Sequence, residues 1–186
     1  MKEGSSMEYF SESYFRDIVG RISSYEQYLY CERVQHAHPN MEFDIFLSYN
    51  IADLNVVKGI YFILRKMGCT VYLDCIVDPD LKRSESDKQT AERIQNRLKH
   101  SKSLLYAQSQ SANQSNWMPW ELGVVDGHTG KCMILPVTKE QAEINPRREY
   151  LLLYPYVKPN SQNEMRVFTE SRNSYGTTIR NYINGM

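Results

Sequence analysis

Short apolar runs alternate with helix-period segments along most of the chain. Four runs are almost continuously apolar, at residues 43–49, 70–74, 103–107 and 131–137. Such runs are typical of strands that are covered on both faces in a parallel sheet. Amphipathic helical patterns fill the intervals, over residues 53–67, over 90–100 and from 117 to 127 or 130. The alternation predicts an α/β fold with a flavodoxin-like, doubly wound parallel sheet of about five strands.

The pattern is less regular after the fourth run. Residues 150–154, Tyr-Leu-Leu-Leu-Tyr, favour a fifth strand at the edge of the sheet, ending before Pro155. Residues 165–168 favour another short strand, and residues 177–183 favour a closing helix. The C-terminal part is therefore expected to complete the sheet.

The N-terminal part has a different pattern. Its apolar residues recur at steps of three and four, namely Phe10, Tyr14, Phe15, Ile18, Val19, Ile22, Tyr25, Tyr28 and Leu29. This period predicts an amphipathic helix or a helical pair, whose aromatic stripe docks on the main domain or on another subunit. Pro39 ends the pattern. We therefore divide the chain into an N-terminal helical extension, residues 1–41, and an α/β domain, residues 42–186.

The composition gives the chain no strong overall charge. Basic and acidic residues number 22 each, so the formal net charge is zero. Such a chain has no overall field to attract nucleic acid or an anionic membrane, and neither is expected as a partner. No run of about 18 apolar residues is present, and the first residues lack the apolar core of a signal peptide. We expect a soluble, cytoplasmic protein.

The cysteines indicate neither a disulfide framework nor a metal site. They are Cys31, Cys69, Cys75 and Cys132, with no Cys-x-x-Cys pair among them. Three lie in or beside apolar runs, where reduced thiols are expected. Cys31 with His36 and His38 matches no zinc-ligand spacing and lacks a fourth ligand. No metal is predicted.

Residues 109–122 contain the candidate chemistry. They follow the third strand directly, and either Ser115 or Asn116 can cap a new helix there. Trp117 and Glu121, at i and i+4, then share one helix face, so that an aromatic ring and an anion line the same pocket. A ribosylated aromatic leaving group would need that pair. The alternative is a core anchor with a carboxylate that stabilises the helix dipole. Trp120 is expected to pack in the core.

A polar connection, residues 75–87, follows the second strand and is too polar for a core element. It is expected to be a long loop at the carboxyl edge of the sheet, where open α/β sheets bind ligands. The helix after it carries charges outside its apolar stripe, at Glu92, Arg93, Arg97 and Lys99. We expect these charges to face solvent.

Three segments together resemble a known family. They are residues 43–49, residues 68–74 and residues 109–122, the last ending in Trp-x-x-x-Glu-Leu. In this order and spacing they resemble the Toll/interleukin-1 receptor (TIR) domain over about residues 42–186. The chain is similar to stand-alone bacterial TIR proteins, including those of Thoeris-type anti-phage systems, in which the domain makes a nucleotide signal for a separate effector protein. The N-terminal helices lie outside the resemblance.

The resemblance implies an enzyme that cleaves NAD at the bond between nicotinamide and ribose. The product is ADP-ribose or a cyclic or conjugated form of it. NAD is then the substrate, and no cofactor or metal is implied. Glu121 falls on the catalytic glutamate of the family, and Trp117 falls on an aromatic residue of the nicotinamide pocket.

The resemblance also implies substrate-binding residues at the ends of the first two strands. Ser48, Tyr49 and Asn50 fall on the segment that lines the NAD site, and Asp74 falls on the acidic residue that opens the flexible loop; Lys82 or Arg83 can supply phosphate contacts from that loop. Two departures weaken the phosphate assignment. Many members have a basic residue just after Ser-Tyr and a glycine in the long loop, and this chain has neither.

Other functions fit parts of the same pattern. A non-enzymatic TIR scaffold would bind other TIR domains through its long loop, although it has no need of an acid beside Trp117. A related fold could also perform a different nucleoside chemistry. Neither a dinucleotide-binding glycine fingerprint nor a P-loop is present, which argues against a dehydrogenase and an ATPase. Self-association is expected through the TIR domains, with the N-terminal helices as a second interface.

Overall fold

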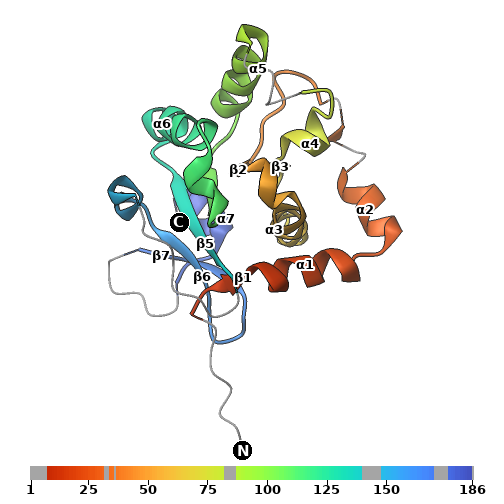
Figure 1. The fold of residues 1–186 in the computed structure, drawn as a ribbon, viewed down its shortest axis with the longest axis vertical. Coiled ribbons are helices and arrows are strands. Elements are labelled where there is room, and N and C mark those ends of the chain that lie inside the picture. The colour runs from red at the N-terminus through yellow and green to blue at the C-terminus, as the bar shows by residue number, and fades with distance from the viewer. Residues whose placement is uncertain are drawn as a thin grey trace, which may run out of the picture.

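A single, mostly parallel sheet forms the centre of the molecule (Figure 1). The computed structural model describes residues 8–31, 34–35, 37–81, 87–139, 148–169 and 176–185. The strand order is β3-β2-β4-β5-β6-β7, with β2 to β6 mutually parallel and β7 antiparallel to β6. The strands are β2 (Ile45–Ser48), β3 (Val71–Tyr72), β4 (Leu104–Gln108), β5 (Cys132–Thr138), β6 (Tyr156–Pro159) and β7 (Met165–Phe168). The predicted doubly wound α/β fold is confirmed.

Helices connect the parallel strands, and one more closes the chain. The connecting helices are α3 (Leu54–Lys66), α4 (Asp74–Val77), α5 (Lys88–Lys99) and α6 (Trp117–Thr129), and α7 (Ile179–Asn184) follows β7. The periodicity predicts all of them except α4. Gly68 stands just after the C-terminal end of α3, and its φ of 82° suits a residue without a Cβ. The side chain of Asp87 caps α5 by accepting a hydrogen bond from the backbone N–H of Thr90. In Figure 1, α5 and α6 lie together on one side, and α3 lies with the N-terminal helix α1 on another.

The strand order places a topological switch point between β2 and β4. The chain passes from β2 to β3 on one side, and then returns past β2 to β4 on the other. Open α/β sheets bind ligands in the crevice at the carboxyl ends of such strands. Here those ends are Ser48 of β2 and Gln108 of β4. Every residue of both strands is buried, as the continuous apolar runs predict.

The N-terminal residues pack against this sheet and against α3. A two-residue strand, β1 (Phe10–Ser11), pairs parallel with the end of β5, and two helices follow, α1 (Glu12–Arg21) and α2 (Ser24–Cys31). Phe15 is fully buried where α1 crosses α3. A Cβ at Gly59 of α3 would lie 2.2 Å from the carbonyl oxygen of Phe15, so this glycine permits backbone-to-backbone contact. The helical pair was predicted, whereas β1 was not.

Two expectations about irregular segments are wrong. Residues 150–154 form no strand: a 3-10 helix, η4 (Glu149–Leu153), stands there instead, and β6 begins only after Pro155. Within η4 only Leu151 is buried, because consecutive leucines cannot all face the core from a turn of helix. The connection after β3 also contains a core element, since α4 buries Ile76 and Val77. The strand at residues 165–168 and the closing helix are confirmed.

Candidate functional site

Glu121 is fully buried beneath the switch point. It lies in α6 at 0% exposure, and its Oε2 accepts a hydrogen bond from the Oγ of Ser48 at 2.5 Å. Ser48 is also fully buried, as the last residue of β2. A hydrogen bond to a carboxylate fixes the rotamer of the acid as well as stabilising it. The structure therefore brings together the two predicted site residues that are furthest from each other in the sequence.

Trp117 lies one helical turn before Glu121, at the start of α6. The Oγ of Ser115 accepts a hydrogen bond from the backbone N–H of Met118 at 3.2 Å, so Ser115 caps the helix. The Trp117 ring is half-buried and packs edge-on against Trp120, with ring centroids 5.7 Å apart. Trp120 is 36% exposed, so the expectation that it packs in the core is wrong. At about 100° around the helix from Glu121, it faces outward while supporting Trp117.

Tyr49 and Asp74 join the end of β2 to the start of α4. The hydroxyl of Tyr49 donates to Oδ1 of Asp74 at 2.7 Å, and the backbone N–H of Cys75 donates to the same oxygen at 2.7 Å. Both side chains are almost fully buried. Two hydrogen bonds on one oxygen fix the position of the first residue of α4, a helix too short to be stable by itself. Two of the predicted site residues therefore contact each other at the carboxyl ends of β2 and β3.

The loops after β2 and β4 are tied together across the switch point. Asn50 donates from Nδ2 to the carbonyl oxygen of Ser111 at 2.8 Å. Its Oδ1 accepts a hydrogen bond from the backbone N–H of Ala52 at 3.0 Å. Asp53 accepts short hydrogen bonds at Oδ2 from the hydroxyls of both Ser109 and Ser111. Asp53, Ser109 and Ser111 were not predicted as site residues. The only available signal was that all three follow the carboxyl ends of strands.

Tyr106, in β4, lies near both Arg148 and Glu121. Tyr106 is fully buried, and burial raises the pKa of its hydroxyl, with the nearby Tyr150 and Glu121 acting in the same direction. The hydroxyl therefore remains protonated at neutral pH. Arg148 donates from Nη2 to the carbonyl oxygen of Asn113 at 2.7 Å, and so supports the loop that leads into α6. The two remaining predicted residues, Lys82 and Arg83, lie outside the described residues.

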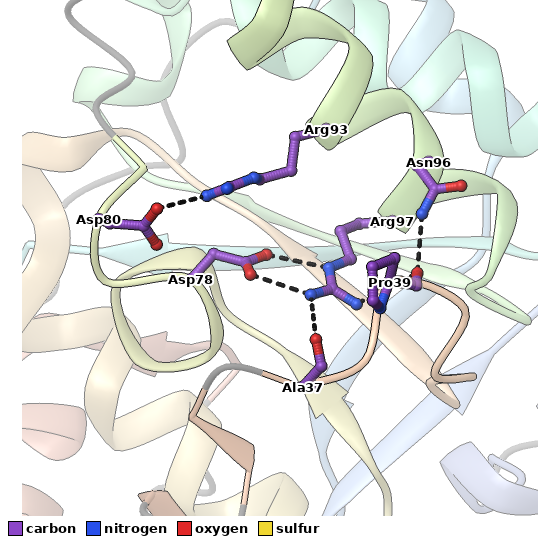
Figure 2. Close-up of a pocket in the computed structure, with 7 residues that line it drawn as sticks. All are labelled: Ala37, Pro39, Asp78, Asp80, Arg93, Asn96 and Arg97. Atoms are coloured by element: carbon purple, nitrogen blue, oxygen red, sulfur yellow. Dashed lines mark hydrogen bonds and ion pairs between the residues drawn. The ribbon is translucent and has the colours of Figure 1, made fainter.

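A cavity of about 220 Å³ lies at the other end of α4, and a buried ion pair forms its wall (Figure 2). Arg97 binds Asp78 through two parallel hydrogen bonds of 2.9 Å. It also donates to the carbonyl oxygens of Ala37, His38 and Pro39. Arg97 is 3% exposed, so the expectation that it faces solvent is wrong. Its partner is 19 residues away in the sequence, and only the fold brings the two together.

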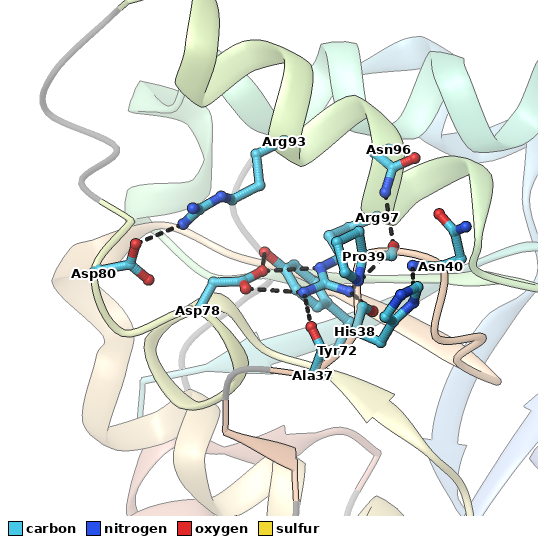
Figure 3. A network of polar contacts seen from close by, with 10 residues as sticks. All are labelled: Ala37, His38, Pro39, Asn40, Tyr72, Asp78, Asp80, Arg93, Asn96 and Arg97. Atoms are coloured by element: carbon cyan, nitrogen blue, oxygen red, sulfur yellow. Dashed lines mark hydrogen bonds and ion pairs between the residues drawn. The ribbon is translucent and has the colours of Figure 1, made fainter.

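The polar network around this pair is extensive (Figure 3). The hydroxyl of Tyr72 donates to Oδ2 of Asp78 at 3.0 Å, and Arg93 binds Asp80 at 2.8 Å across the mouth of the cavity. Asp78 caps the end of α4, whose first residue is Asp74. The network thus fixes the end of α4 opposite to Asp74. It holds the segment at residues 37–40 in place as well.

In the part of the chain that the structure describes, no helix has the length and apolar character needed to cross a bilayer. The described ranges also hold no group of three or more His, Cys, Asp or Glu side chains arranged to bind a metal ion.

Comparison with known proteins identifies similar chains. A family model described as "TIR domain" matches residues 45–171. A Bacillus cereus (strain MSX-D12) protein, named as a probable 3′ cyclic ADP-D-ribose synthase, ThsB′, is 38% identical over 149 residues, which cover 77% of each chain. A Cytobacillus dafuensis protein, whose name assigns it provisionally as a cyclic ADP-D-ribose synthase, TIR2, is 28% identical over 125 residues. That match covers 64% of this chain and 30% of the relative.

Proposed function

This chain belongs to the TIR domain family, and we propose that it cleaves NAD between nicotinamide and ribose and closes the remainder into a cyclic ADP-ribose. The observation that carries the proposal is Glu121, which is buried and oriented by Ser48 at the switch point of the sheet. A buried carboxylate with a fixed rotamer, one turn from a half-buried tryptophan, suits a substrate with a cationic aromatic leaving group.

The cleavage step places positive charge on the ribose. The bond between the anomeric carbon and the nicotinamide nitrogen breaks, and its electron pair leaves with nicotinamide, which becomes neutral. The ribose becomes oxocarbenium-like, and Glu121 stabilises a charge that is present only near the transition state. Because the leaving group is already cationic, it needs no general acid. One carboxylate can therefore do what a glycosidase does with two.

The closing step needs a hydroxyl of the same molecule. That oxygen attacks the anomeric carbon, a C–O bond forms, and the hydroxyl proton passes to solvent. A site that keeps water out allows this reaction to compete with hydrolysis. The names of both relatives specify a cyclic product, and that of the Bacillus cereus protein specifies a 3′ cyclic one. We therefore propose a cyclic ADP-ribose as the product of this chain as well.

The biological role follows from the same resemblance. A diffusible nucleotide made from NAD serves as a signal, and its receiver is a separate effector protein in bacterial anti-phage defence of the Thoeris type. Copies of the chain associate through their TIR domains. The exposed Tyr25 and Tyr28 of α2 offer a second surface for this association.

Substitution of Glu121 tests the proposal. Glu121→Gln keeps the size of the side chain but removes its charge. The rate of NAD consumption should fall at least about a hundredfold, which is the typical rate loss when an enzyme loses a main electrostatic contact to the transition state. Glu92→Gln, at an exposed position of α5, is the matched control and should keep wild-type activity. Incubation at high protein concentration, followed by chromatography and mass spectrometry, gives both the rate and the product. A wild-type chain that leaves NAD intact would favour the scaffold function instead.

A further inference from the structure

Gln108 has a buried polar atom with no hydrogen-bond partner in the part of the chain that the structure describes. The residue is 5% exposed at the carboxyl end of β4, and its Oε1 has no hydrogen-bond partner among the described residues. Native proteins pair almost all buried acceptors, since an unpaired one costs free energy. Open α/β sheets bind ligands at this edge. An unpaired acceptor here therefore points to a donor that arrives with the ligand.

Gln108 lies on the face of the sheet that α6 covers. Ser48 and Tyr106 are register partners in β2 and β4, so their side chains point to the same face. Gln108 follows Tyr106 by two residues and shares that face too. Ser48 identifies the face, because its hydroxyl contacts Glu121 of α6. Gln108 and Glu121 therefore lie on the same face of the sheet, Gln108 on a strand and Glu121 on the helix that covers it.

Gln108 is also level with Trp117. The helix α6 starts at the carboxyl edge and leads back to the start of β5, so it runs roughly antiparallel to β4. The four residues from Glu121 back to Trp117 span about 6 Å toward that edge. The two residues from Tyr106 to Gln108 span about 6–7 Å in the same direction. Glu121 contacts Ser48, which pairs with Tyr106, so these three residues lie at the same height along the strand direction. Trp117 and Gln108 lie about the same distance further toward the carboxyl edge and therefore also share one height.

We propose that Gln108 recognises the carboxamide of the nicotinamide leaving group. Its Oε1 accepts a hydrogen bond from the carboxamide NH₂, while the nicotinamide ring contacts Trp117. NAD has two kinds of donor near the bond that breaks, the ribose hydroxyls and the carboxamide. Glu121 lies deeper and takes the hydroxyls, which leaves the carboxamide for the outer acceptor. The inference rests on the proposed NAD cleavage and adds the residue that selects the leaving group.

A substrate analogue tests this contact directly. In 3-acetylpyridine adenine dinucleotide, a methyl group replaces the carboxamide NH₂ and the carbonyl remains. The measured quantity is the ratio of kcat/KM for NAD to kcat/KM for the analogue. Gln108→Met keeps the side-chain length but removes the acceptor, so this ratio should fall about fivefold to tenfold from its wild-type value. Differences in the reactivity of the two leaving groups cancel when the ratio is compared between variants.

The controls separate a specific contact from damage to the fold. Gln110→Met changes the same residue type at an exposed position two residues away, and should leave the ratio unchanged. Gln108→Asn withdraws the acceptor by one methylene and should lower the ratio as well, so it decides the matter if circular dichroism shows that Gln108→Met does not fold. An unchanged ratio overturns the inference while leaving NAD cleavage intact. A wild-type chain that cleaves neither compound overturns the proposed function itself.

Discussion

The Oγ of Ser48 lies 2.5 Å from Oε2 of Glu121, although 73 residues separate the two in sequence. The hydrogen bond connects the end of β2 to α6, the helix that follows β4. It gives the carboxylate one fixed orientation inside a site from which bulk water is largely excluded. The geometry of the acid thus depends on the packing of α6 against β2.

Replacing Ser48 should therefore affect catalysis more than folding. In Ser48→Ala the carboxylate loses its donor and can turn, so kcat should fall about tenfold or more while KM changes little. Steady-state kinetics of NAD cleavage measure both. Ser103→Ala is the matched control: Ser103 is also fully buried, but its hydroxyl donates to the carbonyl oxygen of Asp44 at the opposite end of the sheet. Equal losses of kcat in the two variants would contradict a local role for Ser48.

Arg97 should contribute far more to stability than its neighbour Arg93. Arg97→Lys keeps the charge but loses the planar fork that binds Asp78 and three carbonyl oxygens, and should cost about 2–4 kcal/mol of unfolding free energy. Arg93→Lys, in the exposed pair with Asp80, should cost less than about 1 kcal/mol. Urea denaturation of both variants measures the difference. An equally small loss of unfolding free energy in both variants would mean that the buried network does not stabilise the position of α4.

Buried thiols should make the protein unstable at alkaline pH. Burial raises the pKa of Cys132 from 9.0 to about 12 and that of Cys69 from 9.0 to about 11. The unfolded chain therefore releases these protons at lower pH than the folded one. The stability that these two protonated thiols contribute is fully present below about pH 9 and is lost as the pH rises toward 11 and 12.

Cys132→Ala provides the measurement. Removing the thiol creates a small cavity, so the variant should be less stable than the wild type at pH 8. The variant has no thiol proton to lose at this position, whereas the wild type is destabilised as the pH rises. The difference in unfolding free energy between the wild type and the variant should therefore become smaller at pH 10 and above. Equilibrium denaturation across this range gives both values. A difference that stays constant with pH would show that Cys132 titrates alike in the folded and unfolded chains.

The contact between α1 and α3 should be sensitive to a single methyl group. In Gly59→Ala the new Cβ would lie 2.2 Å from a backbone oxygen, so the helices must separate, at a cost of about 1–3 kcal/mol. Gly127→Ala, in α6, meets nothing within 4 Å and should be neutral or stabilise the helix by up to about 1 kcal/mol. Thermal unfolding compares the two. A neutral Gly59→Ala would mean that α1 does not stay docked in solution.

Local patterns were sufficient to predict most of the helices and strands and one half of the candidate site. Trp117 and Glu121 could be paired from their spacing, because a helix places i and i+4 on one face. The sheet could be predicted from continuous apolar runs, since parallel strands are covered on both faces. The prediction of a strand at residues 150–154 was wrong because three successive leucines are equally compatible with a strand and with a turn of helix.

The remaining residues depend on contacts that no local pattern encodes. Arg97 looked solvated because its spacing within α5 is that of a polar face, and Asp78 comes from another element. Asp53 looked like an ordinary helix start, whereas its partners, Ser109 and Ser111, follow β4. Gln108 has no periodicity to distinguish it. The role proposed for it became apparent only once β4 was placed and its Oε1 was seen to have no partner among the described residues.

The close approach at Gly59 makes the N-terminal residues part of one packed body with the sheet. Phe15 is fully buried where α1 crosses α3, and Phe10 pairs with Val137 of β5. The family match begins at residue 45, so the packed structure extends further toward the N-terminus than the matched segment does. A chain confined to residues 45–171 would leave the side of α3 that faces α1 uncovered.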